Sequence, residues 1–207
     1  MSPRPYRLGQ RQAATEQTRA RIIGAAREIL MSSDGFSGFS IDAVARQADV
    51  ARMTIYHQFG SKIGLLEALC DDLAGEGGME QLASAFRQAE SLEVLREYIR
   101  IFAHFWQVDR LMTRRLRGFA ALDEDFEQVI RARDERRRKG VQVIVQRLIE
   151  QHKRPLPERQ EEIVNVLFTI LSFESFDMLA GPERSIEDIV PVVQRLVYVI
   201  LGLNEEM

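Results

Sequence analysis

Several residue types on which catalysis and metal binding depend are scarce in this chain. Cys70 is the only cysteine among 207 residues, which excludes an intramolecular disulfide framework and agrees with a reducing compartment. The three histidines, His57, His104 and His152, are far apart, and the sequence has no H-E-x-x-H motif and no Cys/His metal spacing. A glycine-rich phosphate loop and a G-x-S-x-G motif are also absent. The sequence therefore gives little support for an enzyme and predicts neither a metal nor a cofactor.

Long hydrophobic runs are missing as well. The most apolar stretch, residues 189–203, is interrupted by Pro191, Gln194 and Arg195, so it is too short and too polar to span a bilayer. The first residues contain Pro and Arg but no apolar segment of the kind that a secretory signal requires. We expect a soluble, cytoplasmic protein without a membrane partner.

Charge is distributed unevenly along the chain. The net charge is −3, which taken alone argues against a nucleic-acid partner. Residues 1–62, however, hold nine Arg and Lys against five Asp and Glu, whereas residues 63–207 hold nineteen against twenty-six. A basic N-terminal part joined to an acidic remainder is the asymmetry expected when one end of a protein meets phosphate.

Residues 40–62, SIDAVARQADVARMTIYHQFGSK, have the pattern of a helix-turn-helix. Ser40 is a suitable N-cap, and the apolar positions that follow it have helical spacing. Asp49 tolerates the positive φ that a sharp turn requires. The second helix carries Ile55 as its apolar position and many hydrogen-bonding side chains. A small residue where the helices approach, a turn and then a polar helix are typical of a DNA-reading motif.

This segment resembles the N-terminal DNA-binding domain of TetR-family transcriptional regulators. The run Thr54–Lys62 closely follows the end of that family's recognition helix, and the similarity extends from Thr18 to Leu66, about the first third of the chain. Two positions depart from the family pattern: Asp49 stands where glycine is frequent, and Ala51, which cannot cap a helix, stands where Ser or Thr is frequent. The resemblance implies a dimer held by a four-helix bundle of the last two long helices, and a small-molecule pocket in the C-terminal part.

The chain is predicted to be all-α, since apolar residues follow helical periodicity and no segment has a convincing strand pattern. We expect an N-terminal three-helix helix-turn-helix DNA-binding domain at residues 1–62, with a basic arm over residues 1–14 and a first helix from Thr15 to about Ser32. A helix over about 61–74 connects it to a C-terminal helical ligand-binding and dimerisation domain at residues 75–207. Helices in that domain are predicted at about 79–89, 92–108, 110–121, 124–151, 158–179 and 186–202.

The predicted DNA contacts lie on and around the second helix of the motif. Arg52 can donate bidentately to guanine O6 and N7, Thr54 offers a hydroxyl or a methyl contact, and Tyr56 and His57 can reach phosphates or base edges. Lys62 follows a helix start, where backbone N–H groups also attract anions. The full predicted DNA site is Ser40, Arg52, Met53, Thr54, Tyr56, His57 and Lys62.

Two other basic segments leave alternatives open. Arg4, Arg7 and Arg11 in the arm either enter a minor groove or add only diffuse attraction from a disordered tail. The run Arg131–Lys139 suggests a second nucleic-acid patch, but its acidic residues precede basic ones at i, i+4. That arrangement favours a solvated helix laced with salt bridges.

Aromatic residues gather in the C-terminal part, and polar residues such as His104 and Glu174 fall among them. A pocket lined by aromatic side chains with a few polar groups is a usual small-molecule site. The candidate ligand-binding residues are Phe102, Phe105, Trp106, Phe119, Asn165 and Phe168.

The last two predicted helices are apolar on more than one face, so either they are central to the C-terminal domain or a second copy of the chain covers them; we favour the second copy. Val193 and Val197 are placed in that interface. The function hypothesis is a ligand-responsive homodimeric DNA-binding regulator, a repressor released from a near-palindromic operator by a small apolar or amphipathic molecule. The alternative is an all-α enzyme or adaptor in which the helix-turn-helix is architectural, which a catalytic constellation or an absence of salt-sensitive DNA binding would distinguish.

Overall fold

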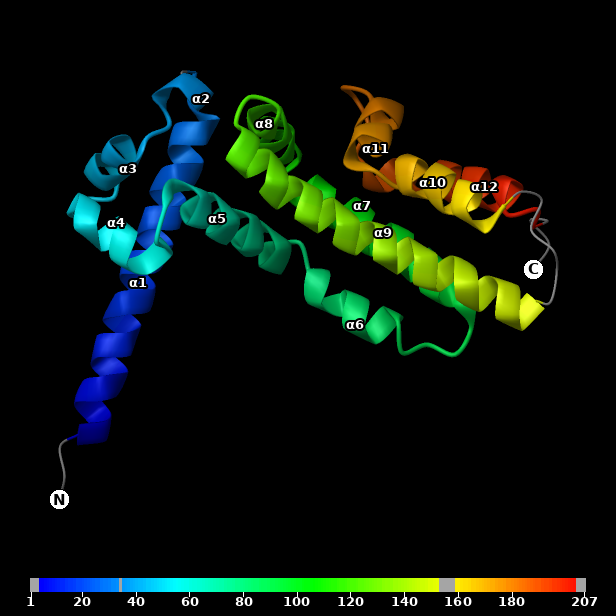
Figure 1. The fold of residues 1–207 in the computed structure, drawn as a ribbon, viewed down its shortest axis with the longest axis horizontal. Coiled ribbons are helices and arrows are strands. Elements are labelled where there is room, and N and C mark those ends of the chain that lie inside the picture. Colours follow the sequence, from blue (N-terminus) through cyan, green and yellow to red (C-terminus); the bar gives the residue numbers. More distant parts are fainter. Residues whose placement is uncertain (1–3, 34, 153–158, 204–207) are drawn as a thin grey trace. The chain divides into compact units, whose positions relative to one another are not determined.

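The computed structural model describes residues 4–33, 35–152 and 159–203, and within these ranges every regular element is a helix. The all-α prediction is confirmed. The α-helices are α1 (Arg4–Met31), α2 (Gly35–Gly38), α3 (Ile41–Gln47), α4 (Arg52–Phe59), α5 (Lys62–Glu76), α6 (Leu82–Ala85), α7 (Ser91–Val108), α8 (Arg110–Ala120), α9 (Glu124–His152), α10 (Gln160–Ile170), α11 (Phe173–Ala180) and α12 (Val190–Ile200) (Figure 1).

The described chain forms two compact units. The first, called the head unit below, contains the residues up to 72 together with 114–127, and the second, called the body unit, contains 73–113 and the residues from 128 onward. The predicted division, into 1–62 and 75–207 with a connecting helix at about 61–74, stays a prediction. It assigned 114–127 to the C-terminal domain, however, whereas this segment packs with the head unit.

The head unit has a core of aliphatic side chains from several helices. Ile22 and Leu30 of α1, Val44 of α3, Ile55 of α4 and Leu65 of α5 have no solvent exposure. Burying an aliphatic side chain contributes about 1.5–3 kcal/mol relative to leaving it exposed. This core therefore fixes α3 and α4 against α1 and leaves their opposite faces to solvent.

The first helix differs from the prediction at its start. α1 begins at Arg4 and runs without interruption to Met31, so residues 4–14 are helical and do not form an irregular arm. The expectation of an N-cap at Thr15 was therefore wrong, because the helix continues through that position. Met1 to Pro3 lie outside the described residues.

The turn between α3 and α4 has the predicted chemistry. The Ser40 Oγ accepts a 3.1 Å hydrogen bond from the Ala43 N–H and so caps α3. Asp49 is the only described non-glycine residue with a positive φ, 50°. Ala51 precedes α4 without a side-chain cap. Gly60 then ends α4 with φ of 74°, in the region that glycine adopts without steric cost.

α5 leaves this motif by a tight turn that only glycine permits. A Cβ atom built on Gly64 would lie 2.0 Å from the carbonyl oxygen of Phe59, well inside van der Waals contact. Substitution at Gly64 would therefore separate the end of α4 from the first turn of α5. The direction of α5 away from the helix-turn-helix depends on this close approach.

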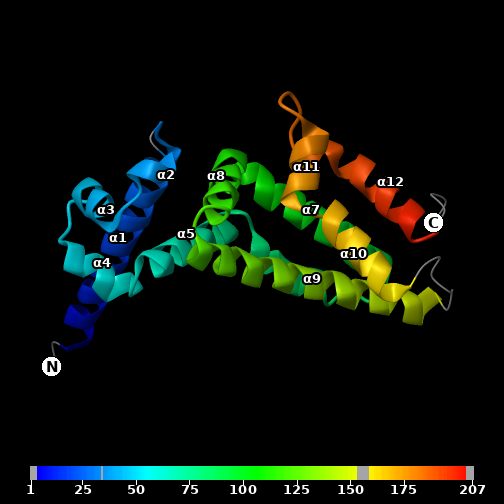
Figure 2. The same ribbon diagram turned by 45° about the horizontal axis from the view of Figure 1, so that its top comes forward.

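The body unit is built on the long helices α7 and α9, with α10 and α12 packed beside each other (Figure 2). Its core includes the fully buried Ile99, Val145 and Leu167, together with Val193 and Val197 of α12. The predicted helices at 92–108, 110–121 and 124–151 agree with α7, α8 and α9 to within a residue or so at each end.

Three other predicted helices are shorter or broken. The 79–89 segment is a 3₁₀ turn, Met79–Gln81, followed by the single turn of α6, and 186–202 is a 3₁₀ turn followed by α12. The 158–179 segment is two helices, α10 and α11, bent by 51° at Leu171 and Ser172. Ser172 caps α11 by accepting from the Ser175 N–H, so local capping competes with continuation of the helix. The predicted break at Pro155–Pro157 lies outside the described residues.

Ser185 and Asp188 form the predicted capping box. The Ser185 Oγ accepts from the Asp188 N–H and the Asp188 carboxylate accepts from the Ser185 N–H, both at 3.0 Å. Two backbone donors that precede α12 are satisfied in this way.

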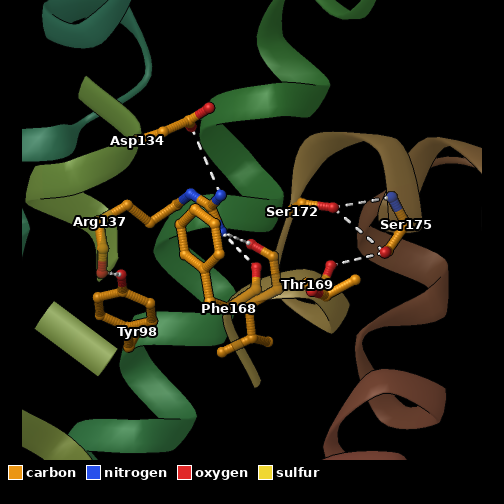
Figure 3. A network of polar contacts seen from close by, with 8 residues as sticks. Tyr98, Asp134, Arg137, Phe168, Thr169, Ser172 and Ser175 are labelled. Carbon is orange, nitrogen blue, oxygen red and sulfur yellow. Dashed lines mark hydrogen bonds and ion pairs between the residues drawn. The ribbon is translucent and has the colours of Figure 1, made fainter. Parts of the chain in front are cut away.

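A buried arginine joins α9 to the bend between α10 and α11 (Figure 3). The Arg137 guanidinium donates to the carbonyl oxygens of Phe168 and Leu171, each at 2.8 Å, and lies 4.0 Å from the centre of the Phe168 ring. The Tyr98 hydroxyl donates to the Arg137 carbonyl at 2.8 Å. The prediction of a wholly solvated basic run was therefore wrong at Arg137, because end-of-helix carbonyls require a donor.

None of the described helices is by itself long and apolar enough to span a membrane. α10 and α11 pass the same test of length and composition only when taken together across their bend, and buried helices of a protein core also pass it.

Candidate functional site

α4 presents a mixed polar and apolar surface. Ile55 is fully buried and anchors the helix, while Arg52, Met53 and His57 are exposed and Thr54 and Tyr56 are half-buried. Met53 is 67% exposed, which is unusual for a large apolar side chain. A helix with this surface can offer hydrogen bonds to base edges and phosphates and an apolar contact to a thymine methyl group.

Arg52 is held by two neighbours. One of its terminal nitrogens lies 3.2 Å from the Asp42 carboxylate of α3, and the other donates to the Tyr56 hydroxyl at 3.2 Å. The guanidinium also lies 5.5 Å from the centre of the Tyr56 ring. The Tyr56 hydrogen bond first, and then the Asp42 charge, raise the pKa of Arg52. Sequence reasoning did not find Asp42.

Ser40 lies at the start of α3, exposed, with its oxygen accepting from the Ala43 N–H. The Ser40 hydroxyl oxygen therefore caps α3, and the hydroxyl can still donate its hydrogen to an acceptor. The first backbone N–H groups of α3 point in the same direction as this hydroxyl, as at any helix N-terminus. An anion at this end of α3 would accept hydrogen bonds from the Ser40 hydroxyl and from these backbone N–H groups.

Lys62 has more partners than the sequence indicated. Its ammonium lies 3.3 Å from the Asp123 carboxylate, 4.8 Å from the centre of the Phe119 ring and 5.8 Å from that of Phe39. All four residues belong to the head unit. Asp123 precedes α9, and no sequence pattern pointed to it, because sixty-one positions separate it from Lys62.

The Asp123 carboxylate is itself fixed by the start of α9. Its oxygen accepts from the Phe126 N–H at 3.1 Å, and this bond, followed by the Lys62 contact, lowers the pKa of Asp123 against a partial opposing effect of desolvation. A carboxyl with a lowered pKa in the folded state contributes stability that is present above its usual pKa and lost as the pH falls through the lowered value. Mild acidification therefore leaves the Lys62–Asp123 pair intact.

The predicted ligand-binding residues are divided between the two units. Phe102 and Trp106 are buried in the body unit with ring centres 5.2 Å apart, and Trp106 also packs against Phe176 at 5.1 Å. Phe105 contacts Gly77, where an added Cβ would lie 2.5 Å from the ring. Phe119 instead stacks on Phe36 in the head unit, 5.2 Å between ring centres.

Asn165 and Phe168 of α10 lie beside basic residues of α9. The exposed Asn165 accepts a hydrogen bond from Arg138, and the Phe168 ring is flanked by the Arg137 and Arg138 guanidinium groups. His104 pairs with Glu187 at 2.8 Å near the surface. The structure thus places five of the six candidates in the body unit beside aromatic or cationic side chains, and only Phe119 in the head unit. The ligand-binding role of all six stays a prediction.

Comparison with known proteins identifies the head. Residues 22–69 match the family described as "Bacterial regulatory proteins, tetR family". Over 58 residues the chain is 40% identical to the HTH-type transcriptional regulator UidR of Escherichia coli (strain K12), which is 28% of this chain and 29% of UidR. The HTH-type transcriptional regulator SrpR of Pseudomonas putida is 40% identical over 57 residues, 28% of this chain and 26% of SrpR. The chain thus covers less than a third of the length of these relatives.

Solved structures resemble the fold over most of the chain. The transcriptional regulator FadR from Bacillus subtilis in complex with stearoyl-CoA has a TM-score of 0.64 at 17% identity, covering 89% of this chain and 99% of that one. The TetR family transcriptional regulator PfmR from Thermus thermophilus has a TM-score of 0.61 at 22% identity, covering 90% and 100%. The helix-turn-helix segment of this chain thus belongs by sequence to the TetR family of transcriptional regulators, a family of non-enzymes, and the fold of the whole chain is similar to that of these regulators.

Proposed function

We propose that the protein is a homodimeric, ligand-responsive repressor that acts on DNA in the cytoplasm. The observation that carries this proposal is the exposed face of α4, with Arg52, Met53 and His57 projecting from a helix anchored by the buried Ile55. Two such helices, one from each protomer, would enter successive major grooves of a near-palindromic operator. Ser40 and Lys62 would contact phosphates on either side of each groove.

The proposed effector is a small apolar or amphipathic molecule that binds the body unit. Support comes from the buried aromatic cluster around Trp106 and from the structural similarity to FadR of Bacillus subtilis, whose structure contains stearoyl-CoA. A ligand shifts the DNA affinity only by its different affinities for the DNA-bound and released arrangements. A coupling free energy of about 1–3 kcal/mol changes operator affinity by about 5–150-fold.

DNA binding is tested with genomic fragments selected by the purified protein. The affinity for the enriched operator is then measured by fluorescence anisotropy at several salt concentrations. We expect the logarithm of the affinity to fall linearly with the logarithm of the salt concentration, and Arg52→Ala to weaken operator binding by about tenfold or more. Arg87→Ala, which removes an exposed charge from the body unit, is the matched control and leaves operator binding unchanged. Equal affinities of the wild type and Arg52→Ala would contradict the assignment of α4.

Effector binding is tested with stearoyl-CoA as the probe. Because Trp106 is the only tryptophan and packs against four phenylalanine rings, a ligand that enters this region changes its fluorescence. We expect the emission change and the release of operator DNA to occur at the same ligand concentration. Unchanged emission and DNA affinity would exclude acyl-CoA as the effector class.

A further inference from the structure

The contacts of Arg52 fix its direction before any DNA is present. Its two terminal nitrogens have different partners, Asp42 on the preceding helix of the motif and Tyr56 one turn along the same helix. Arg52 is the first residue of α4 and Asp42 lies in the first turn of α3, so the pair bridges the two helices of the motif. The guanidinium is therefore held from both helices.

These contacts leave the guanidinium able to bind a base. A guanidinium has five N–H donors, and one on each terminal nitrogen is directed to Asp42 or Tyr56. The remaining donors suffice for the bidentate pair that arginine makes with O6 and N7 of guanine. More than half of the Arg52 side chain is exposed, as its 56% relative accessibility shows, so a base edge can approach it.

An acidic residue at position 42 lowers the affinity for DNA, and some other effect of Asp42 has to compensate for this loss. A carboxylate near the DNA-reading helix repels phosphates and weakens attraction to every DNA sequence alike. An exposed ion pair of this kind adds little to fold stability. An acidic side chain in the first turn of α3 interacts favourably with the helix dipole. Orientation of Arg52 is a second gain, because a long side chain that is already fixed loses less conformational entropy when it binds.

We propose that Asp42 is a positioning residue for base recognition, which aims Arg52 at a guanine of the operator. Tyr56 supports the same guanidinium through its hydroxyl and ring. Asp42 thus raises specificity by aligning the correct contact, while its charge lowers the affinity for every DNA sequence alike. The inference rests on the proposed DNA-binding function, since it assigns a role within the same surface.

The experiment compares the wild type, Asp42→Asn and Asp49→Asn on the selected operator and on a set of its single-base-pair variants. Asp42→Asn keeps the size of the side chain and removes its charge. Asp49→Asn is the matched control, because it removes the same charge from an exposed position of the same motif that makes none of the contacts described for Arg52. Asparagine also tolerates the positive φ of that turn position.

We expect Asp42→Asn to reduce discrimination at one G·C base pair by about tenfold, within the range of a bidentate contact, and to strengthen binding to unrelated DNA. In an Arg52→Ala background, the further change Asp42→Asn should have no effect at that base pair. Asp49→Asn should leave the pattern of discrimination unchanged. Circular dichroism on each variant checks that the helix content is retained.

The outcomes separate this inference from the proposed function. If Asp42→Asn changed the affinity for every base-pair variant by the same factor, as Asp49→Asn would, Asp42 would contribute only charge and the positioning role would be overturned. If Arg52→Ala retained full discrimination at every base pair, the guanine contact itself would be overturned while DNA binding stood. A wild-type protein that bound no DNA would overturn the proposed function and the inference with it.

Discussion

Arg136 and Arg137 are neighbours in the basic run of α9, but their environments differ. The Arg136 side chain is exposed, whereas Arg137 is buried and donates to two carbonyl oxygens at the bend between α10 and α11. The cation also lies over the Phe168 ring, which partly compensates for its removal from water. Arg137 therefore has a structural role, as a buried hydrogen-bond donor, although the residues around it in the sequence are mostly charged.

Arg137→Met is expected to destabilise the body unit. Methionine fills a similar volume but donates no hydrogen bond, so the Phe168 and Leu171 carbonyls would lose their partner. A buried unsatisfied acceptor costs about 1–3 kcal/mol, and a lower midpoint of urea unfolding would report the loss. Arg136→Met is the control and stays within about 0.5 kcal/mol of the wild type, as surface substitutions usually do. Equal midpoints for the two variants would show that Arg137 is not a structural donor.

Residue types and spacing were enough to predict some local contacts and not others. Ser40 and the Ser185–Asp188 box act as caps because the donor and acceptor are three residues apart in sequence. The Arg52–Asp42 and Lys62–Asp123 contacts join residues on different helices, so they depend on tertiary packing that no local pattern encodes. Sequence reasoning therefore proposed the DNA-reading residues, which stay a prediction, but missed the acidic partners that contact two of them.

At the scale of elements, the segment from the middle of α8 to the start of α9 has an unexpected position. From its position in the sequence, this segment is predicted to belong to the C-terminal domain. It packs instead in the head unit, where Asp123 contacts Lys62. Arg115 of α8 likewise donates to the carbonyl oxygens of Leu30 and Ser32 at the end of α1. α8 and α9 each have residues in both units and thus connect them covalently.

Asp123→Asn is expected to strengthen operator binding. The carboxylate competes with DNA phosphate for the Lys62 ammonium, and the amide would compete less because it has no charge. If Lys62 then neutralises one more phosphate, the slope of log affinity against log salt becomes steeper by about 0.9. Affinity and slope are measured by anisotropy on the same operator over a salt series.

Asp125→Asn is the matched control for this prediction, since it removes the same charge two residues along from an exposed position. It should change the affinity slightly through general electrostatics and leave the slope as in the wild type. Identical behaviour of the two variants would mean that Lys62 is not shared between Asp123 and phosphate.

The bend between α10 and α11 shows where helix prediction fails for a physical reason. Apolar residues continue with helical spacing through Leu171, so periodicity predicts one long helix. Ser172 instead caps a new helix, and Arg137 satisfies the carbonyls freed at the break. The sequence contained the capping residue, but its effect depended on a donor from α9.

At the scale of the whole molecule, the structure changes the residues expected at a dimer interface. Val193 and Val197 are fully buried in the core of their own protomer, so the prediction that places these two residues in the interface is wrong. The apolar residues that α12 leaves exposed are Leu196 and Val199, and Val166 of the adjacent α10 is also exposed. One apolar face of α12 therefore packs inward, and the other is exposed in the single chain.

A dimer through α10 and α12 remains a prediction, and Val199→Asp tests it. The Val199 side chain is 71% exposed in the single chain, so aspartate there does not disturb the protomer core. In an apolar interface, however, a carboxylate loses its hydration without gaining a partner. We expect sedimentation velocity at micromolar concentration to show a dimeric wild type and a monomeric variant with unchanged circular dichroism.

Val143→Asp is the control for that experiment, because Val143 of α9 is 48% exposed in the same unit but lies outside α10 and α12. It should remain dimeric. The Val199→Asp monomer should also bind the near-palindromic operator much more weakly, since the second half-site then has to recruit its own protein molecule instead of one already tethered to the first. A dimeric Val199→Asp protein would move the interface to another surface, and a monomeric wild type would remove the dimer from the proposed mechanism.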